Sequence, residues 1–561
     1  MFNVIPGWTG DQTNQKMKKI IYITALAAAM NSCVNDLDTL PLNKTEPISE
    51  YVYGTDESGY LQGLARLYFQ FVTNDLTDLQ SMDGGASEVI RAFWSAQETT
   101  ADAAKCSWEN DAWVRALNTN TWSEVQNDAL YAIYVRTLQG ISFVNEYLRQ
   151  TDPSRLAERG VPTDLAVKIE GFRAEARFVR AYLYWMALDC FGNVPFTTED
   201  SPIGGAYFPE QKSRADVFSY CVSELSYLMS SESALPPPRS NYPRADKGSA
   251  AGLLARMYLN AGVYTGEAMW QEAKNVCESI FGMGYSLCPD YASLFRGDNG
   301  ENPLVLGEML WAVAYDSGKT ESYGGSSYIL SASLAATDIT DQSRPNGQIN
   351  GWAGLRVPFE YVERYFNVGE RDYDTGTYEI ADKRGDIFYI KGREESMDGA
   401  LYSFMNGWSC LKFNNIPHDQ TNESFLAQSA VENFADVDFP MIRLAEVYLI
   451  YAEACMNLGM DALALPRLAE LSERAAVPSP TEITPDFLVA ERARELMWEG
   501  HRRTDLIRFG LYHSQEYLWP YKGGSSYSGQ AFPEYRCIFP IPPTELAAND
   551  RLVQNPGYAR P

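Results

Sequence analysis

A charged segment near the C-terminus holds the densest set of groups that could work as acids and bases. It reads ERARELMWEGHRRTDLIRFG, residues 491–510, and its carboxylates and guanidiniums recur three or four residues apart. That spacing makes the groups neighbours on one helix, where opposite charges pair. Acid–base hydrolysis of a glycosidic bond needs two carboxyl groups that converge across a cleft, which one helix face does not supply. We therefore interpret these charges as structural.

Aromatic side chains are the second group with a possible chemical role. The chain has 12 Trp and 35 Tyr, and its aromatic share is 13%. Many of these residues stand in polar, glycine-bearing stretches, where a helical core cannot absorb them. Sugars have apolar C–H faces that can stack on such rings, although most aromatic residues of helical proteins serve packing. Amide or carboxylate groups beside a ring would bind the sugar hydroxyls.

The third group is a single thiol at the end of a leader-like segment. Met17 and the basic residues Lys18 and Lys19 precede an apolar run over residues 20–30, which ends on small residues and Cys33. This pattern is typical of a secretory signal, and the run is too short to span a bilayer. The cysteine resembles that of a bacterial lipobox, so we predict lipidation of Cys33 and removal of residues 1–32. Residues 1–16 are interpreted as a start-site extension.

Composition excludes several partners and cofactors. The formal net charge is −27, and loss of residues 1–32 would remove three lysines and one aspartate and leave −29. Such a chain repels nucleic acid, so no nucleic-acid partner is expected. The three histidines, His418, His501 and His513, have no metal-site spacing, and no phosphate-binding glycine loop occurs. We expect no cofactor and no metal with a readable motif; scattered Asp and Asn leave calcium open.

The elements that must position these groups are mostly helices. Residues 55–72 form an amphipathic pattern with Thr55 as the expected N-cap, and residues 123–148 open on an expected capping box from Ser123 to Gln126. A third helix is predicted from Thr163 to a stop at Gly192. Most of the nine cysteines are expected to be small buried residues.

Two helical hairpins of tetratricopeptide type are predicted far apart in the chain. The first covers residues 247–287 and is rich in small residues, and the second covers residues 443–475. Because they are not in tandem, we expect a scaffold rather than a regular solenoid. Between them, residues 286–440 are richer in Gly, Ser, Asn, Asp and Tyr, with short strands expected in EMLWAVAYD and GDIFYIKG. Long loops of this kind usually carry function.

The domain organisation expected from these patterns has four parts. Residues 1–32 are the removed signal peptide, and residues 33–300 are a helical region with tetratricopeptide-like hairpins. Residues 301–440 are loop-rich and carry ligand-binding loops. Residues 441–561 are helical and pack on the same scaffold, forming one compact unit with residues 33–300.

Several segments together resemble the SusD/RagB family of outer-membrane glycan-binding lipoproteins. These segments, in the family's order, are FRAEARFVRAYLYWMALDCFGNVPF, RADKGSAAGLLARMYLNAG, FPMIRLAEVYLIYAEACMNLG, ERARELMWEGHRRTDLIRFG and CIFPIPPTELAANDRLVQNPGY. The resemblance implies an all-α, SusD-like fold with long irregular loops and a few short strands. It implies a non-catalytic, lipid-anchored protein on the outer surface of the outer membrane that captures oligosaccharides. It also implies a partner, a SusC-like TonB-dependent transporter.

The resemblance and the loop composition together suggest ligand-binding residues. Family members commonly have an acidic, Trp-containing loop between the first two helices; here it offers Trp94, Trp108 and Trp113, and Ala101-Asp102 stands where relatives often have an acidic pair. The middle region adds further rings and amides on polar loops. The candidate ligand-binding residues are Trp94, Asp102, Trp108, Trp113, Tyr323, Tyr328, Asn346, Asn350 and Trp352.

Other functions remain open from the residues alone. A peptide-binding, RagB-like uptake lipoprotein would share the fold and the anchor. A helical glycoside hydrolase would need two acids that face each other across a substrate, and the loops contain no such pair that can be read from spacing. A tetratricopeptide adaptor would bind only protein. The abundance of aromatic residues in loops favours sugars modestly.

Overall fold

The fold is described from a computed structural model of the chain. It describes residues 52–74, 84–123, 127–204, 207–335, 338, 345–348, 350–421, 423–425 and 434–559. Residues Thr55–Pro561 make up one compact unit. Cys33 and the expected signal segment lie outside the described residues, so the lipidation site stays a prediction.

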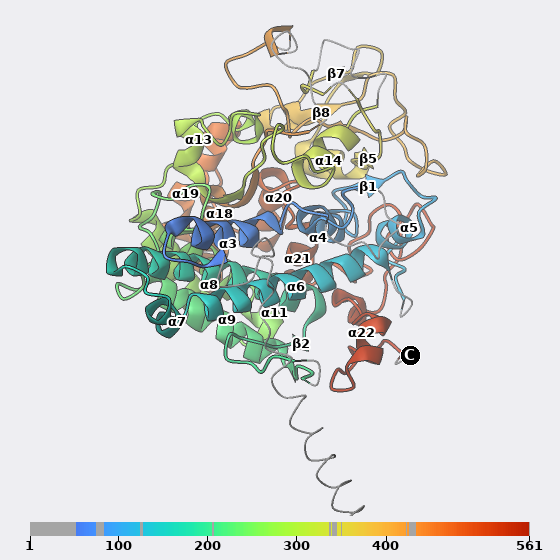
Figure 1. Cartoon of the computed structure of the whole chain (residues 1–561). Helices are drawn as coiled ribbons and strands as arrows, with labels where there is room; N and C mark the ends of the chain where they lie inside the picture. The colour runs from blue at the N-terminus through green and yellow to red at the C-terminus, as the bar shows by residue number, and fades with distance from the viewer. Residues whose placement is uncertain are drawn as a thin grey trace, which may run out of the picture. The chain divides into compact units, whose positions relative to one another are not determined.

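Helices dominate the described chain (Figure 1). In the first half they are α3 (Glu57–Phe69), α4 (Val89–Glu98), α5 (Ala112–Asn118), α6 (Asp128–Gln150), α7 (Pro153–Glu158), α8 (Thr163–Phe191), α9 (Arg214–Met229), α10 (Lys247–Leu259), α11 (Ala261–Thr265) and α12 (Trp270–Phe281). In the second half they are α13 (Pro303–Glu308), α14 (Gly325–Ala332), α16 (Phe359–Phe366), α18 (Leu444–Asn457), α19 (Asp461–Ala475), α20 (Pro485–Glu495), α21 (Arg502–Arg508) and α22 (Pro543–Ala548). Short 3-10 helices are η1 (Ala292–Phe295), η2 (Lys383–Ile387) and η3 (Glu534–Cys537).

The strands are short and pair two by two, all antiparallel. The pairs are β1 (Lys105–Cys106) with β5 (Leu355–Arg356), β2 (Val194–Pro195) with β3 (Gln211–Lys212), β4 (Met309–Val313) with β10 (Phe439–Arg443), β6 (Arg371–Asp372) with β7 (Thr377–Tyr378), and β8 (Phe388–Tyr389) with β9 (Ser409–Cys410). The expected all-α class with a few short strands is confirmed. The strands predicted in EMLWAVAYD and GDIFYIKG are β4 and β8.

Two of the expected helix starts are corrected by the structure. The first helix is capped by Asp56, whose carboxylate accepts the Ser58 N–H, and not by Thr55. The long second helix is capped by Asn127, whose side chain accepts the Leu130 N–H, so its cap lies beyond the expected Ser123–Gln126 box. In both cases a neighbouring residue with a suitable side-chain oxygen satisfies the free N–H groups of the first turn.

Helix α8 forms the middle of the helical body. It runs from Thr163 to Phe191 and ends at Gly192, which has a positive φ of 68°, as the sequence predicts. Its charged residues tie it to neighbouring helices: Arg177 binds Glu224 of α9 at 2.6 Å, and Arg180 binds Asn145 of α6 at 2.7 Å. These ion pairs and hydrogen bonds fix the packing of α6, α8 and α9.

The two predicted hairpins are present and meet in space. Helices α10 and α12 form the first pair, α18 and α19 form the second, and α12 packs against α18. The paired strands β4 and β10 lie beside α10. Trp311 of β4 packs against Tyr182 of α8, with 4.6 Å between the two ring centroids. Hairpins separated by well over a hundred residues therefore share one apolar core.

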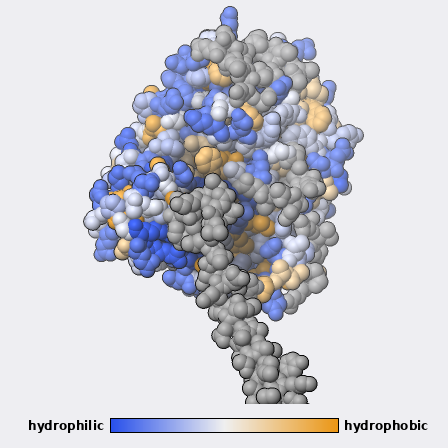
Figure 2. All heavy atoms as spheres, in the orientation of Figure 1, coloured by the Kyte–Doolittle hydropathy of each residue, from blue (hydrophilic) through white to orange (hydrophobic). Residues whose placement is uncertain are grey.

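The loop-rich segment with β7 and β8 lies at the top of the view in Figure 1, and β5 lies lower, at the level of α14. The face shown in Figure 2 is mostly hydrophilic, with small scattered hydrophobic groups. The described cysteines are all unpaired, and all but Cys537 are buried, which confirms their interpretation as packing residues. Within the described ranges, none of the helices combines the length and the apolar character that crossing a bilayer requires.

Candidate functional site

Three aromatic side chains meet at the surface of the loop-rich segment. Tyr323 is 41% exposed, and Trp352 and Phe434 are partly exposed. The Tyr323 ring centroid lies 5.7 Å from that of Trp352 and 5.0 Å from that of Phe434, and the ring planes are tilted by 59° and 45°. We call Tyr323, Trp352 and Phe434 the aromatic cluster. It offers several ring faces to one ligand, which suits stacking on the C–H face of a sugar.

The loop that carries Tyr323 lies directly against the start of α4. The Tyr323 carbonyl accepts a hydrogen bond from Arg91 at 3.4 Å. A side chain on Gly85 would meet the Tyr323 backbone at 2.2 Å, and one on Gly324 would meet the Glu88 carboxylate at 2.2 Å. Only glycine allows backbones to approach so closely. The Gly324-Gly325 pair therefore lets the loop rest on α4 and fixes the position of the ring.

Trp352 is held by the end of α14. The Trp352 N–H donates to the Ser331 carbonyl at 2.8 Å, and the next two N–H groups donate to the carbonyls of Leu334 and Ala332 at 2.9 and 3.0 Å. The last carbonyls of a helix have no partner within it. Residues 352–354 supply those partners, and the ring of Trp352 is thereby fixed to a rigid element.

Trp108 lies beside the same backbone segment. Its indole Nε1 donates to the Ala353 carbonyl at 3.1 Å, and Gly354 packs on the face of its ring. The side chain is partly exposed, and its ring centroid lies 5.9 Å from that of Tyr328. Of the sequence-predicted residues, the structure thus brings Trp108, Tyr323 and Trp352 into one neighbourhood. Asn350 is exposed and stands two residues before Trp352, so its amide is a polar neighbour of the cluster.

The other predicted aromatic residues lie in the interior. Trp94 is 1% exposed and donates from Nε1 to the Trp498 carbonyl at 2.9 Å. Tyr328 is also 1% exposed, and the Arg91 guanidinium lies 4.0 Å from its ring centroid. Trp113 is buried within α5. These rings pack the elements behind the aromatic cluster and present no open ring face at the surface.

The polar candidates Asp102 and Asn346 are buried as well. Arg502 donates to both oxygens of Asp102 at 2.7 and 2.9 Å, and Tyr517 donates to the same carboxylate. Burial alone would raise the pKa of Asp102, but Arg502 outweighs it and holds the pKa below its ordinary value. Asn346 donates to the Leu330 carbonyl at 3.3 Å. Both side chains are engaged with protein partners.

Phe434 is the member of the cluster that sequence reasoning missed. It stands in VENFADVD, a short polar stretch that carries no pattern to separate it from other phenylalanines. Its sequence distance from Tyr323 exceeds one hundred residues, so only the fold brings the two rings together. The only available signal was an apolar ring among acidic residues.

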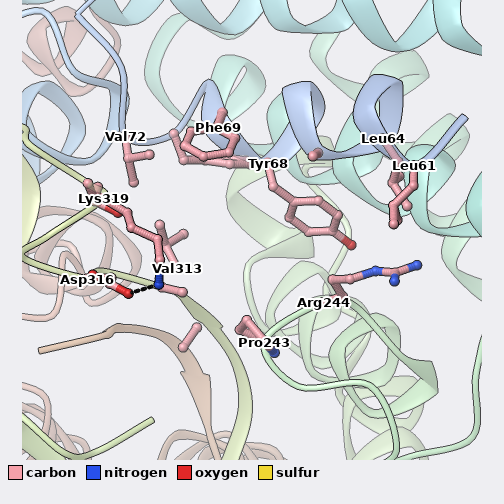
Figure 3. A pocket seen from close by; sticks show the side chains of 15 residues that line it. Leu61, Leu64, Tyr68, Phe69, Val72, Pro243, Arg244, Val313, Asp316 and Lys319 are labelled. Carbon is pink, nitrogen blue, oxygen red and sulfur yellow. Dashed lines mark hydrogen bonds and ion pairs between the residues drawn. The ribbon is translucent and has the colours of Figure 1, made fainter. Parts of the chain in front are cut away.

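An apolar cavity of about 270 Å³ lies between α3 and the segment that follows β4 (Figure 3). Leu61, Leu64 and Phe69 line one side of it. Its charged residues are already paired, since Lys319 binds Asp316 at 2.5 Å and Arg244 binds Glu175. A sugar would leave its hydroxyls without partners there, which is costly. The cavity therefore does not suit a polar ligand such as a sugar.

A larger polar cavity of about 480 Å³ lies next to η1. Lys412, at its wall, donates to the Met497 carbonyl and to Glu499, both at 2.6 Å. Arg474 binds Glu308 at 2.7 Å and also pairs with Glu495. These charged groups are committed to buried ion pairs, and the aromatic rings lining it, Tyr291 and Phe295, are buried. The cavity therefore lacks the accessible ring face that the aromatic cluster provides.

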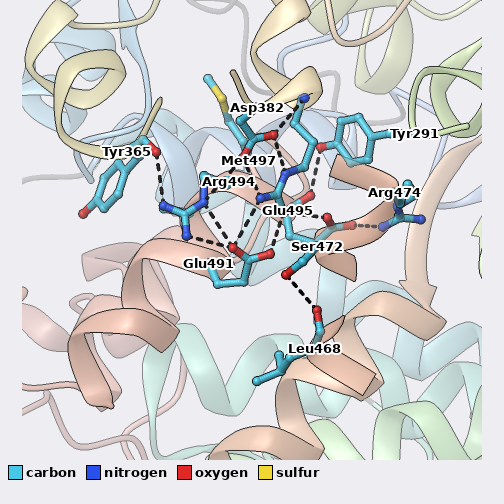
Figure 4. Close-up of polar contacts among 12 residues, drawn as sticks. Tyr291, Tyr365, Asp382, Leu468, Ser472, Arg474, Glu491, Arg494, Glu495 and Met497 are labelled. Carbon is cyan, nitrogen blue, oxygen red and sulfur yellow. Dashed lines mark hydrogen bonds and ion pairs between the residues drawn. The ribbon is translucent and has the colours of Figure 1, made fainter. Parts of the chain in front are cut away.

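The charged segment 491–510 forms a buried ionic network (Figure 4). Arg384 binds Glu491 at 2.7 Å and Glu495 at 3.0 Å, and Arg443 binds Glu495 at 2.6 Å. Burial alone would raise the pKa of Glu491, but Arg384 and Arg494 outweigh it and hold the pKa below its ordinary value. These carboxylates are ionised, paired and shielded from water. The arrangement is that of a structural network.

Among the residues that the structure describes, one group of side chains could hold a metal ion. Asp298, His418 and Asp419 bring possible ligand atoms within 4.8 Å of one another. The His418 ring is hydrogen-bonded directly to Asp298, which raises the pKa of the imidazole. His418 and Asp419 are exposed. This hydrogen bond gives the His418 ring and the Asp298 carboxylate a partner without a metal ion.

Two family models match the chain. One, described as the SusD family, matches residues 307–558, and the other, described as starch-binding and associating with the outer membrane, matches residues 74–259. The chain is 30% identical over 570 residues to the starch-binding protein SusD of Bacteroides thetaiotaomicron, covering 96% of this chain and 97% of that protein. It is 26% identical over 359 residues to a SusD-like protein of Bacteroides ovatus, covering 60% and 59%.

Solved structures show the same fold. A laminarin-binding SusD-like protein matches with a TM-score of 0.63 at 22% identity, over 90% of this chain and all of that one. Surface glycan-binding protein A from Bacteroides thetaiotaomicron, in complex with laminarihexaose, matches with a TM-score of 0.66 at 19% identity, over 88% and 98%.

Proposed function

Because this chain belongs to the SusD family, we propose that it binds oligosaccharides at the cell surface through the aromatic cluster. The observation that carries the proposal is the meeting of Tyr323, Trp352 and Phe434 on rigid backbone at an exposed face. Exposed rings seldom gather on a soluble surface without a binding role. Trp108 and Asn350 extend the site with a further ring and an amide. A starch-type α-glucan is the first ligand to test, because a relative of nearly full length is described as starch-binding.

The binding role is proposed without catalysis. The acids that a glycoside hydrolase would use must reach the substrate, yet the acidic side chains of residues 491–510 are buried in ion pairs. Glu88, below the cluster, is fully buried and accepts hydrogen bonds from Tyr315 and Ser322. This supports capture of the glycan rather than its cleavage.

The proposal includes the anchor and the partner. Lipidation of Cys33 would hold the protein on the outer membrane, and a SusC-like TonB-dependent transporter would receive the bound glycan. The description of one family model as associating with the outer membrane supports this location. The strong negative charge of the chain disfavours nucleic acid as a ligand and is compatible with uncharged sugars.

Affinity electrophoresis tests the site. Purified protein is run through gels that contain amylopectin, laminarin, xylan or mannan. We expect retardation in at least one gel, and we expect Tyr323→Ala and Trp352→Ala each to weaken that binding about tenfold, as the loss of a stacking ring implies. Tyr227→Ala, which removes a tyrosine 38% exposed on α9, is the matched control and should bind as the wild type does.

Parallel measurements separate the alternatives. Thermal unfolding of each variant shows whether the fold is intact, and a reducing-sugar assay shows whether glycosidic bonds are cut. Reducing ends that accumulate with rigorously purified protein would support the hydrolase instead. Retention of peptides from a casein digest, with no retardation by any polysaccharide, would support the peptide-binding alternative.

A further inference from the structure

We propose that the glycan-binding surface continues from Trp108 and Trp352 onto the loop of residues 397–407, where Tyr402 and Phe404 contact a second stretch of a polysaccharide chain. This inference rests on the proposed glycan-binding function. It adds that the ligand is a long chain, gripped at two places, rather than a short oligosaccharide held at one.

The loop exposes three large apolar side chains within four positions. Tyr402 is 70% exposed, Phe404 is 44% exposed and Met405 is 41% exposed. Most other exposed large apolar residues among those described occur singly, as is normal for a surface. Such a local group of exposed rings indicates contact with another molecule.

The backbone beneath these rings is fixed by two buried arginines. The Phe404 carbonyl accepts hydrogen bonds from Arg356 and from Arg393, the latter at 3.0 Å. Both arginines are almost completely buried, and Arg393 also pairs with Asp338. These two hydrogen bonds fix the position of the Phe404 backbone.

The loop is also anchored from its own inward side. Leu401 and Met397 are buried and pack with Tyr521, whereas the neighbouring Tyr402 is exposed to solvent. Ser403 donates to Asn406 at 2.7 Å, and Asn406 donates to the Ser396 carbonyl at 2.9 Å. A platform held in this way loses little conformational entropy when a ligand binds.

The loop is hydrogen-bonded to residues that neighbour Trp108 and Trp352 in the chain. Ser107, next to Trp108, donates to the Ser403 carbonyl at 3.4 Å. Arg356, which holds Phe404, stands in β5 only four residues after Trp352, so the two Cα atoms lie within about 14 Å. The loop is thus hydrogen-bonded to Ser107, beside Trp108, and to strand β5, which follows Trp352 in the chain.

The chemistry of the loop favours a sugar chain over a protein surface. Apolar Tyr402 and Phe404 alternate with Ser403, and Met405 and Asn406 follow. Ring faces that accept C–H groups are one requirement of a sugar site, and the Ser403 hydroxyl and the Asn406 amide hold the backbone that presents them. We take a sugar chain as the occupant because the loop is hydrogen-bonded through Ser107 to the residues beside the proposed glycan site.

The test compares one long and one short ligand. Amylopectin and maltotriose are the probes; if the wild type is retarded by laminarin instead, laminarin and laminaritriose replace them. We expect Tyr402→Ala and Phe404→Ala to weaken polysaccharide binding about five- to tenfold and to change trisaccharide affinity less than about twofold. Tyr323→Ala and Trp352→Ala should weaken both ligands, and Tyr227→Ala should weaken neither.

The outcomes distinguish this inference from the proposed function. A wild type that binds no glycan would overturn both. Loop variants that bind polysaccharide as the wild type does, while Trp352→Ala loses it, would overturn only the second contact. So would loop variants that weaken the trisaccharide as much as the polysaccharide, or that lose only the copurification of a membrane protein. Because Tyr402 is so exposed, its loss should leave the melting temperature unchanged.

Discussion

Glu88 is a buried titratable residue beneath the loop that carries Tyr323. Its fully buried carboxylate accepts hydrogen bonds from Tyr315 at 2.6 Å and from Ser322, which precedes Tyr323 in the loop. Burial raises the pKa of Glu88 to about 7, although these hydrogen bonds and the nearby Arg91 and Arg136 act in the opposite direction. The carboxyl group therefore changes charge near neutral pH, directly beneath the loop that carries Tyr323.

Replacement of Glu88 by glutamine should remove this pH response. The unfolded chain loses its proton near pH 4.5, whereas the folded protein keeps it until about pH 7. The free energy of unfolding of the wild type therefore falls as pH rises through that window, by up to about 3 kcal/mol from this group. We expect the stability of Glu88→Gln, relative to the wild type, to increase from pH 5 to pH 8 in urea unfolding.

The difference between the two proteins isolates Glu88. Burial also raises the pKa of Glu98 to about 7 and that of Asp438 to about 6, but these groups titrate in both proteins and cancel in the comparison. A stability difference that stays constant from pH 5 to pH 8 would show that ionisation of Glu88 is not linked to folding.

At the scale of elements, small residues decide how closely the first hairpin packs on the strand pair. A side chain on Gly252 of α10 would lie 2.5 Å from Ile442 of β10 and 3.0 Å from Leu310 of β4. Ala250, Ala251 and Ala255 of the same helix are completely buried. The helix therefore approaches both strands because its contact face carries almost no side-chain volume.

The same substitution at two helical glycines should have opposite effects. Gly252→Ala forces a methyl group against Ile442 and should lower the free energy of unfolding by about 1–3 kcal/mol. Gly171→Ala, on α8, meets only the Ala234 carbonyl at an ordinary 3.5 Å and should raise it by about 0.5–1 kcal/mol, because alanine favours the helix. Urea unfolding measures both. Equal effects would mean that the packing at Gly252 relaxes without cost.

At the scale of the whole molecule, the negative net charge of the chain bears on how the protein would attach to a membrane. A net charge of −27 and a mostly hydrophilic visible face (Figure 2) keep the described body away from anionic headgroups. Under the proposed location at the outer membrane, attachment would come from a segment other than this body. Acyl chains at Cys33 would provide it, since several chains together hold a protein firmly.

Replacement of Cys33 by alanine should release the protein from the membrane. We expect the wild type to sediment with outer membranes, to carry acyl groups at its mature N-terminus by mass spectrometry, and to copurify with a large outer-membrane barrel protein. Cys33→Ala should appear in the soluble fraction, whereas the matched control Cys537→Ala, at a partly exposed free cysteine, should remain membrane-bound. An unmodified, soluble wild type would contradict the anchor and weaken the transporter proposal.

The sequence by itself determined the local elements of this protein. Helical periodicity located α3, α6 and α8, glycine fixed the end of α8, and small residues marked the two hairpins. It also indicated that the charges of residues 491–510 are structural, but the expected pairing along one helix is wrong: the segment divides into α20 and α21, and its main partners, such as Arg384 and Arg443, come from distant segments. The N-caps of α3 and α6 lie a few residues from the predicted positions, since several neighbouring side chains can accept the free N–H groups of the first turn.

Only the tertiary structure decided which of the candidate residues share a surface. Trp94 and Trp108 stand in the same predicted loop, yet one is buried against Trp498 and the other lies beside Trp352. Phe434 joins Tyr323 from more than one hundred residues away. Exposure depends on what distant segments cover, and no short sequence pattern encodes that contact. The family is therefore readable from residue order, whereas the site required the packed fold.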